Sequence, residues 1–136
     1  YKHAAMFPIQ DGIEGEVQFG DLRRRGARVS LDALEEALRG RCQGRVIHFG
    51  CCQTLGVSQR RLRKFIEETG ALAVSGYEKD IDWVRSAMLD FTLFASIQQN
   101  TMTVAGMRAV RRRMQLRQGR EIRSLAFRMA LREPRS

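Results

Sequence analysis

The chain lacks any run of about 18 apolar residues, the length that a membrane-spanning helix needs. Its first residues also lack the basic segment followed by an apolar segment that marks a secretory signal peptide. Together these absences predict a soluble, cytoplasmic protein. The first residue is Tyr1 and not methionine, and strand-like residues begin at once, so we expect a C-terminal fragment of a larger parent chain.

Cysteine is scarce, and its spacing does not suit a metal. The three cysteines are Cys42, Cys51 and Cys52, an odd number with two adjacent, which favours reduced thiols over a disulfide framework. No CxxC pair occurs, so we expect no metal site. The phosphate-binding patterns GxGxxG and GxxxxGK[ST] are also missing, and we expect no cofactor.

Positive charge is concentrated at the end of the chain. The net charge is +9, and residues 108–136 alone carry ten arginines against two glutamates, a net charge of +8. Such a segment suits an acidic face of the parent chain, an acidic partner or the phosphates of a nucleic acid. Phe127 is its single aromatic residue and is predicted to point inward, so no platform for base stacking is visible.

Hydrophobic periodicity and capping residues predict alternating strands and helices within one domain, residues 1–136. Ser30, Ser58 and Thr103 are predicted helix caps, because a hydroxyl accepts a hydrogen bond from a free amide of the first turn. The predicted strands are residues 15–20 (a strand or hairpin arm), 45–49, 71–76 and 125–132, and the predicted helices are residues 31–38, 59–69, 80–99 and 103–114. This order indicates an α/β domain with a mostly parallel sheet.

The longest predicted helix runs from Asp80 to about Gln99. Its predicted inward stripe consists of Val84, Ala87, Met88, Phe91, Phe94 and Ala95. Trp83, Leu93 and Ile97 lie off that stripe, so we expect this helix to be buried on more than one side or to lie at an interface. In the last strand, residues 125, 127, 129 and 131 are predicted to face inward and their neighbours to be solvated, as at a sheet edge.

The stretch "VIHFGCCQTLG", residues 46–56, is a buried strand that runs into two cysteines and a turn. Alternation puts His48 and Cys52 on one face and Cys51 on the other. His48 and Cys52 are about 13 Å apart along an extended strand, with parallel side chains, so they form no thiolate–imidazole pair. His48 is predicted to be structural and satisfied by neighbouring backbone. His3 is then the single imidazole candidate for a base.

The stretch "VIHFGCCQTL", a basic helix and "TGALAVSGYEKDIDWVRSAMLDFTLFASI" resemble the caspase-like CHAT family of clan CD cysteine peptidases and its uncharacterised bacterial relatives. The resemblance implies a three-layer α/β caspase-like fold with a mostly parallel central sheet, whose N-terminal strands are missing from this chain. It also implies that Cys52 is the nucleophile, with Cys51 in the small-residue position before it and Thr54 after it. The family's histidine, normally followed by glycine, corresponds here to His3, followed by Ala4.

The activity implied by the resemblance is peptide hydrolysis. Neutral His3 would take the proton of Cys52, the thiolate would attack a peptide carbonyl, and amides near Gly50 and Cys52 would hold the oxyanion. Asp80 and Asp82 are candidates for a pocket that binds a basic side chain of the substrate. Acidic residues at a helix start more often cap the helix and complement its dipole.

Three other functions are compatible with the sequence. Ala4, where the family has glycine, favours a catalytically inactive caspase-fold module that binds protein or peptide partners. The Arg-rich segment 108–136 favours a basic nucleic-acid-binding α/β domain. A doubly wound domain that binds a small ligand is the third, although the phosphate-binding loops are missing.

Overall fold

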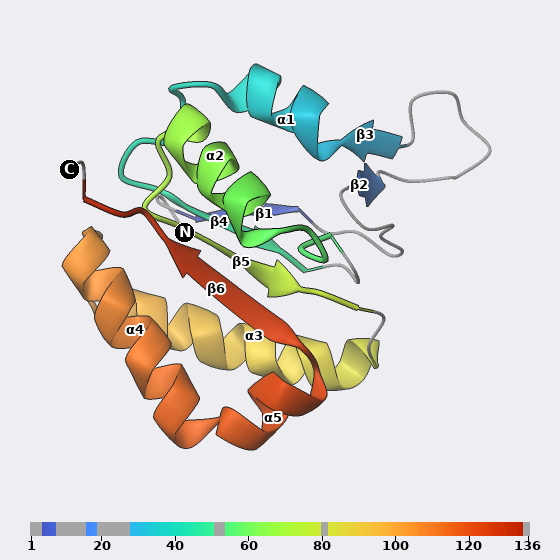
Figure 1. The fold of residues 1–136 in the computed structure, drawn as a ribbon. Helices are drawn as coiled ribbons and strands as arrows, with labels where there is room; N and C mark the ends of the chain where they lie inside the picture. The colour runs from blue at the N-terminus through green and yellow to red at the C-terminus, as the bar shows by residue number, and fades with distance from the viewer. Residues whose placement is uncertain (1–3, 8–15, 19–27, 51–53, 80–81, 135–136) are drawn as a thin grey trace.

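The computed structural model describes residues 4–7, 16–18, 28–50, 54–79 and 82–134. Within these residues the main sheet has four strands in the order β1-β4-β5-β6 (Figure 1). These strands are β1 (Ala4–Phe7), β4 (Val46–Phe49), β5 (Ala73–Tyr77) and β6 (Phe127–Leu131). β1, β4 and β5 are parallel, and β6 runs antiparallel to β5. The predicted mostly parallel sheet is confirmed.

Helices cover both faces of the main sheet, which gives three layers (Figure 1). On one face lie α1 (Leu31–Leu38) and α2 (Gln59–Thr69), and on the other lie α3 (Trp83–Gln98), α4 (Val104–Arg117) and α5 (Gly119–Ser124). The predicted hairpin arm is confirmed: β2 (Glu16–Gln18) pairs antiparallel with β3 (Arg28–Ser30), which leads into α1. Helix α5 had no sequence prediction. No helix in the described ranges has the length and apolar character needed to cross a membrane.

The predicted starts of α1, α2 and α4 are confirmed, whereas α3 begins at Trp83 and not at Asp80. Ser30 Oγ accepts a hydrogen bond from Ala33 N at 3.1 Å, and Ser58 Oγ accepts one from Arg61 N at 3.1 Å. Thr103 Oγ1 caps α4 in the same way, with its donor at 3.0 Å. Each hydroxyl satisfies an amide that has no partner inside its helix, so these residues set where the helices begin.

The sheet separates two apolar cores, and strand alternation decides which side chains enter each. Ile47 and Phe49 of β4 pack with the apolar residues of α1 and α2. Val46, the residue before Ile47, packs with residues of α3 and α4 on the opposite face. All four residues of β4 are buried, as expected for a central parallel strand covered by helices on both sides.

The prediction of which residues of α3 face inward is wrong. Val84, Met88, Phe91 and Ala95 are exposed, and only Phe94 of that stripe is buried. The buried apolar residues are instead Leu89, Leu93, Phe94 and Ile97. The helix carries apolar residues on two faces, so periodicity alone does not decide which face meets the sheet. Of the residues predicted to lie off the stripe, Leu93 and Ile97 are buried and Trp83 is exposed.

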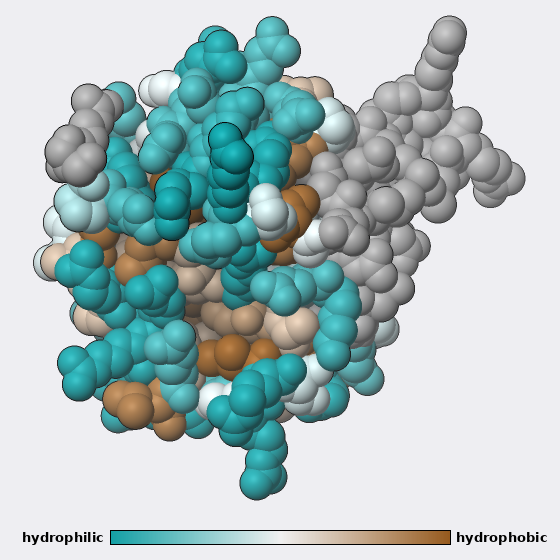
Figure 2. Space-filling model, in the orientation of Figure 1, coloured by the Kyte–Doolittle hydropathy of each residue, from teal (hydrophilic) through white to brown (hydrophobic). Residues whose placement is uncertain are grey.

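Strand β6 forms an edge of the described sheet, as predicted, but its second face is not solvated. Ala130 packs in the core under α1 and α2, and Arg128 is half-buried. Met129 faces the other core, as predicted. Figure 2 shows a less polar band along β6 between the hydrophilic surfaces of the two helix layers. Both faces of this strand are covered because helices flank the sheet on each side.

Gly106 of α4 allows the chain before α4 to approach the helix closely. A Cβ atom at this position would lie 1.9 Å from Thr101 O, whereas one at Gly119 would meet only the flexible end of Arg123, at 3.3 Å. We expect Gly106→Ala to lower the free energy of unfolding by about 2 kcal/mol or more, because backbone must move. The matched change Gly119→Ala should raise it by about 0.5 kcal/mol. Urea denaturation measures both, and equal effects would contradict the close approach.

Candidate functional site

Four polar side chains meet where β4 and β5 approach their carboxyl ends, and we refer to them as the His48–Asp90 cluster. His48 Nδ1 lies 2.8 Å from Ser75 Oγ, and His48 Nε2 lies 2.8 Å from Asp90 Oδ1. The Tyr77 hydroxyl lies 2.5 Å from the same carboxylate oxygen and 3.0 Å from Ser86 O. One carboxylate of α3 is thus bonded to side chains from both central strands.

The chemistry of these groups assigns the protons. An ionised carboxylate only accepts, so His48 Nε2 carries a hydrogen and donates it to Asp90. In neutral imidazole Nδ1 then accepts from the Ser75 hydroxyl. The single hydroxyl proton of Tyr77 goes to Asp90 or to Ser86 O. His48 is fully buried, and the side chain of Asp90 is 15% exposed, so these bonds form away from bulk water.

The cluster corrects one prediction about His48. The sequence predicts a structural histidine satisfied by neighbouring backbone, but the partners of both ring nitrogens are side chains, Ser75 and Asp90. The ring also packs edge-on against Phe94, with centroids 5.2 Å apart. With both nitrogens engaged and no solvent access, His48 is held as a structural residue. The ring has no solvent-accessible surface, so its imidazole does not reach a substrate that approaches from solvent.

Two glycines shape the edge next to the cluster. A Cβ at Gly50 would lie 3.6 Å from Asp90 Oδ2, so the chain leaving β4 passes directly beside the carboxylate. A Cβ at Gly76 would lie 3.0 Å from Phe49 O and 3.1 Å from the Leu55 side chain, which is tighter than an ordinary contact. Gly76 therefore leaves the room that the segment after β4 needs to return over β5. Leu55 N completes this return by donating to Tyr77 O at 3.0 Å.

Arg128 of β6 holds the same returning segment from the other side. Its guanidinium donates to Leu55 O at 3.1 Å and to Val57 O at 2.7 Å. Arg128 Nε also lies 3.6 Å from a Glu78 carboxylate oxygen. A guanidinium presents several donors in a rigid fork, which suits it to bind two carbonyls at once. This residue, predicted to be solvated, therefore fixes the loop that follows the strand "VIHF".

Of the four predicted site residues, the structure describes Asp82. Cys52, His3 and Asp80 lie outside the described residues, as does Cys51. Asp82 is the N-cap of α3, where its Oδ1 accepts from Val84 N at 2.9 Å and from the next amide at 3.0 Å. The capping interpretation of Asp82 is confirmed, and its role in a substrate pocket stays a prediction.

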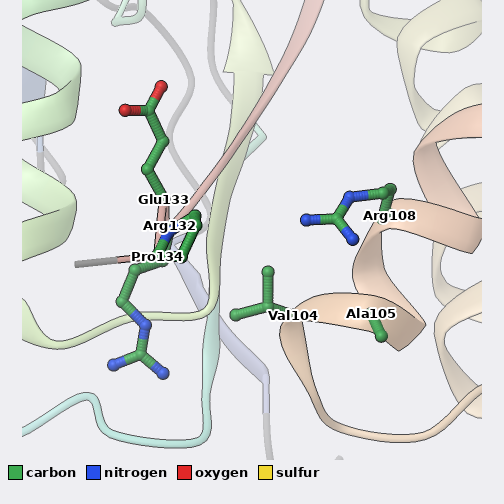
Figure 3. A pocket seen from close by; sticks show the side chains of 6 residues that line it. All are labelled: Val104, Ala105, Arg108, Arg132, Glu133 and Pro134. Atoms are coloured by element: carbon green, nitrogen blue, oxygen red, sulfur yellow. The ribbon is translucent and has the colours of Figure 1, made fainter. Parts of the chain in front are cut away.

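A separate pocket opens at the other end of the strands, away from the His48–Asp90 cluster. Its volume is 380 Å³, and it lies between the start of α4 and the segment after β6 (Figure 3). Arg108 and Val104 line it from α4, and Arg132–Pro134 line it from the other side. Glu133 is paired with Arg63 of α2 at 3.0 Å. No group of three metal-ligating side chains occurs among the residues that the structure describes, in this pocket or elsewhere.

A protein-family model matches residues 13–130, and its description is "Family of unknown function (DUF6642)". The chain belongs to the DUF6642 family. No curated protein and no solved structure matches it. The match takes in all four members of the His48–Asp90 cluster and also Cys52, whereas His3 precedes it.

Sequence reasoning missed Ser75, Tyr77, Asp90 and Arg128 in this DUF6642 domain. Asp90 had a usable signal, because it is the single acidic residue inside the apolar helix α3. A lone carboxylate in such a helix needs a buried partner, and His48 in an otherwise apolar strand needs one too. Arg128 had no such signal, because its partners are backbone carbonyls far away in the sequence.

Removing the Asp90 carboxylate should be costly. Asp90→Ala leaves the buried N–H of His48 without its acceptor, whereas the Tyr77 hydroxyl can still donate to Ser86 O, and we expect a loss of about 3 kcal/mol in the free energy of unfolding. Asp90→Asn keeps an acceptor oxygen and should cost about 1 kcal/mol. The control is Asp32→Ala, which removes a carboxylate 80% exposed in its pair with Arg61 and should cost about 0.5 kcal/mol. Similar losses for Asp90→Ala and Asp32→Ala in urea denaturation would contradict this role.

Cys42 should be a slow thiol in the folded domain. Burial raises the pKa of the Cys42 thiol above its ordinary value of 9.0, and the nearby Arg45 only partly opposes this. We expect iodoacetamide at neutral pH to label Cys42 at least about tenfold more slowly in the native protein than in urea, because the thiolate reacts.

The same pKa shift has a consequence for stability. Since the pKa of Cys42 is higher in the folded state, its contribution to stability is present below pH 9.0 and is lost as the pH rises through the folded-state pKa. The wild-type protein should therefore lose stability relative to Cys42→Ala in that alkaline range. A difference that stays constant with pH would contradict the raised pKa.

Proposed function

We propose that this DUF6642 domain is a caspase-like α/β domain of the CHAT type that binds peptide segments at the carboxyl edge of its main sheet and does not hydrolyse them by itself. A mostly parallel sheet with helices on both faces supports the fold assignment. The stretch "VIHFGCCQTL" supports the CHAT type and points to Cys52 as the residue in the nucleophile position. Ligands of such sheets bind outside the carboxyl ends of the strands, where β4 leads into this stretch.

The proposal rests on the positions of the two residues that could act as a base for Cys52. The chain has two histidines. Both ring nitrogens of His48 are engaged in the buried cluster. His3 precedes Ala4, and Ala4 pairs with Val46 at the amino end of β4, whereas Cys52 follows the carboxyl end after Phe49. Those two ends are about 10 Å apart along the paired strands. Ala4, the residue after His3, thus lies at the end of the strand pair opposite to Phe49.

A cysteine peptidase is the second candidate. The observation in its favour is the return of the chain after β4, which Arg128 and Leu55 hold at the carboxyl edge next to "GCCQ". A loop fixed in this way suits the display of a nucleophile and of backbone amides toward a peptide carbonyl. In this alternative Cys52 attacks the peptide after His3 takes its proton, and Asp80 and Asp82 bind a basic side chain of the substrate.

A hydrolysis assay separates the two candidates. The wild-type domain and Cys52→Ala are incubated with a mixed library of fluorogenic peptides. We expect the same background rate for both, because a thiol without a base or a lowered pKa is a weak nucleophile. Hydrolysis by the wild type that is abolished in both Cys52→Ala and His3→Ala would overturn the proposal in favour of the peptidase.

A binding assay tests the proposal directly. Peptides selected from a displayed random library against the wild-type domain should lose affinity by about tenfold or more toward Cys52→Arg, because a long charged side chain would fill the edge. Cys52→Ala should bind them as the wild type does, since no covalent bond is required. Binders that do not distinguish Cys52→Arg from the wild type would rule out this edge as the peptide site.

A further inference from the structure

Large apolar side chains are exposed along one helix of this domain. Trp83, Met88 and Phe91 of α3 are 77%, 67% and 70% exposed, and Val84 is 50% exposed. We refer to these four residues as the α3 stripe. Among residues 30–50, 54–79 and 82–134, the only other large apolar side chain with such exposure is Leu116 of α4. Large apolar side chains that are exposed together on one helix indicate an interaction surface.

The α3 stripe lies opposite the face that the core uses. Val84, Met88 and Phe91 are spaced at i, i+4 and i+7, so they lie on one side of the helix. Leu89, Leu93 and Ile97 occupy the buried side and pack with α4 and the sheet. The rotation of α3 is held by Asp90, so the helix cannot turn the stripe inward without breaking the His48–Asp90 cluster.

Arginines lie beside this stripe. Arg85 Nη2 donates to Ser124 Oγ at 3.1 Å, which ties α5 to the first turn of α3. Arg120 and Arg123 of α5 are exposed. Neither forms an ion pair with a carboxylate in the part of the chain that the structure describes. Arg120 and Arg123, on the helix that Ser124 ties to the first turn of α3, are therefore available to an outside partner.

The charged residues of α3, α4 and α5 indicate the chemistry of the partner. Residues 83–125 contain eight arginines, two acidic residues and no lysine. A second copy of the chain seated on the same face would bring like charges together, which disfavours self-association. Phosphates of lipids or nucleic acids are bound by lysine as well as arginine, whereas protein interfaces are enriched in Trp, Phe, Met and Arg and depleted in Lys. The guanidinium fork also matches a carboxylate in two bonds.

We propose that the α3 stripe, with Arg120 and Arg123 beside it, docks an acidic amphipathic segment of another protein. Apolar side chains of that segment cover Met88 and Phe91, and its carboxylates pair with the two arginines. The stripe from Val84 to Phe91 is about 10 Å long, enough for roughly two turns of a docked helix. This surface is distinct from the carboxyl edge of the sheet, so the inference goes beyond the proposed function and does not depend on it.

The experiment uses a displayed library of helical peptides of about 18 residues, five turns, with apolar residues at i, i+3, i+4 and i+7. The remaining positions vary from fully acidic to fully basic. We expect selection against the wild-type domain to enrich Asp and Glu. The selected peptides should bind Met88→Ser and Phe91→Ser about tenfold or more weakly than wild type, and both variants should fold because these side chains are exposed.

Matched controls separate position from bulk properties. Leu116→Ser removes an equally exposed apolar side chain outside the stripe and should leave binding unchanged. Arg120→Glu should weaken binding, whereas Arg60→Glu on α2, with the same change in net charge, should not. A library without acidic enrichment, or binders insensitive to Phe91→Ser, would overturn the proposal. So would tighter, stripe-dependent binding of a single-stranded oligonucleotide or of phosphatidylserine vesicles.

Discussion

The carboxylate of Asp90 joins helix α3 to the two central strands, and much of this domain depends on that junction. One oxygen is bonded to His48 of β4 and lies 2.5 Å from the hydroxyl of Tyr77 on β5. A charged acceptor inside a mostly apolar layer is costly unless it is bonded in this way. The bonds therefore allow one rotation of α3 and disfavour the others. That rotation buries Leu89 and Leu93 and turns Met88 and Phe91 outward.

The same junction organises the carboxyl edge of the sheet. The chain leaves β4 at Gly50, directly beside Asp90, and returns over Gly76 to a position held by Arg128. The edge thus combines a buried, fully bonded imidazole with a short loop anchored at its far end. A site of this kind can hold a peptide against fixed backbone groups. Using it for hydrolysis would require a base within reach of the substrate, and His48 is fully buried.

The two helix layers differ in how their charges are compensated. On α1 and α2, Arg61 pairs with Glu35 and Arg39 pairs with Glu68. On α4 and α5, no arginine pairs with a carboxylate among the described residues. The layer that exposes the α3 stripe is thus also the layer with unpaired cations. Exposed apolar side chains and arginines without carboxylate partners therefore lie on the same helix layer. This combination favours a negatively charged protein partner.

Local features of the sequence were sufficient for the alternation of strands and helices from α1 to α4, the helix caps and the parallel pairing of β4 and β5. Ser30, Ser58 and Thr103 act through amides three residues away, so their effect is readable without the fold. The buried run "RVIHF" also needed only its own composition to be recognised as a central strand.

The tertiary structure decided what depends on contacts between distant residues. It chose between the two apolar faces of α3, because His48, 42 residues before Asp90, selects the face that turns inward. It also brought Arg128 to carbonyls more than 70 residues away. Periodicity shows that a helix or strand is amphipathic, but a buried polar bond between remote residues determines which side is buried, and apolar periodicity alone does not encode that choice.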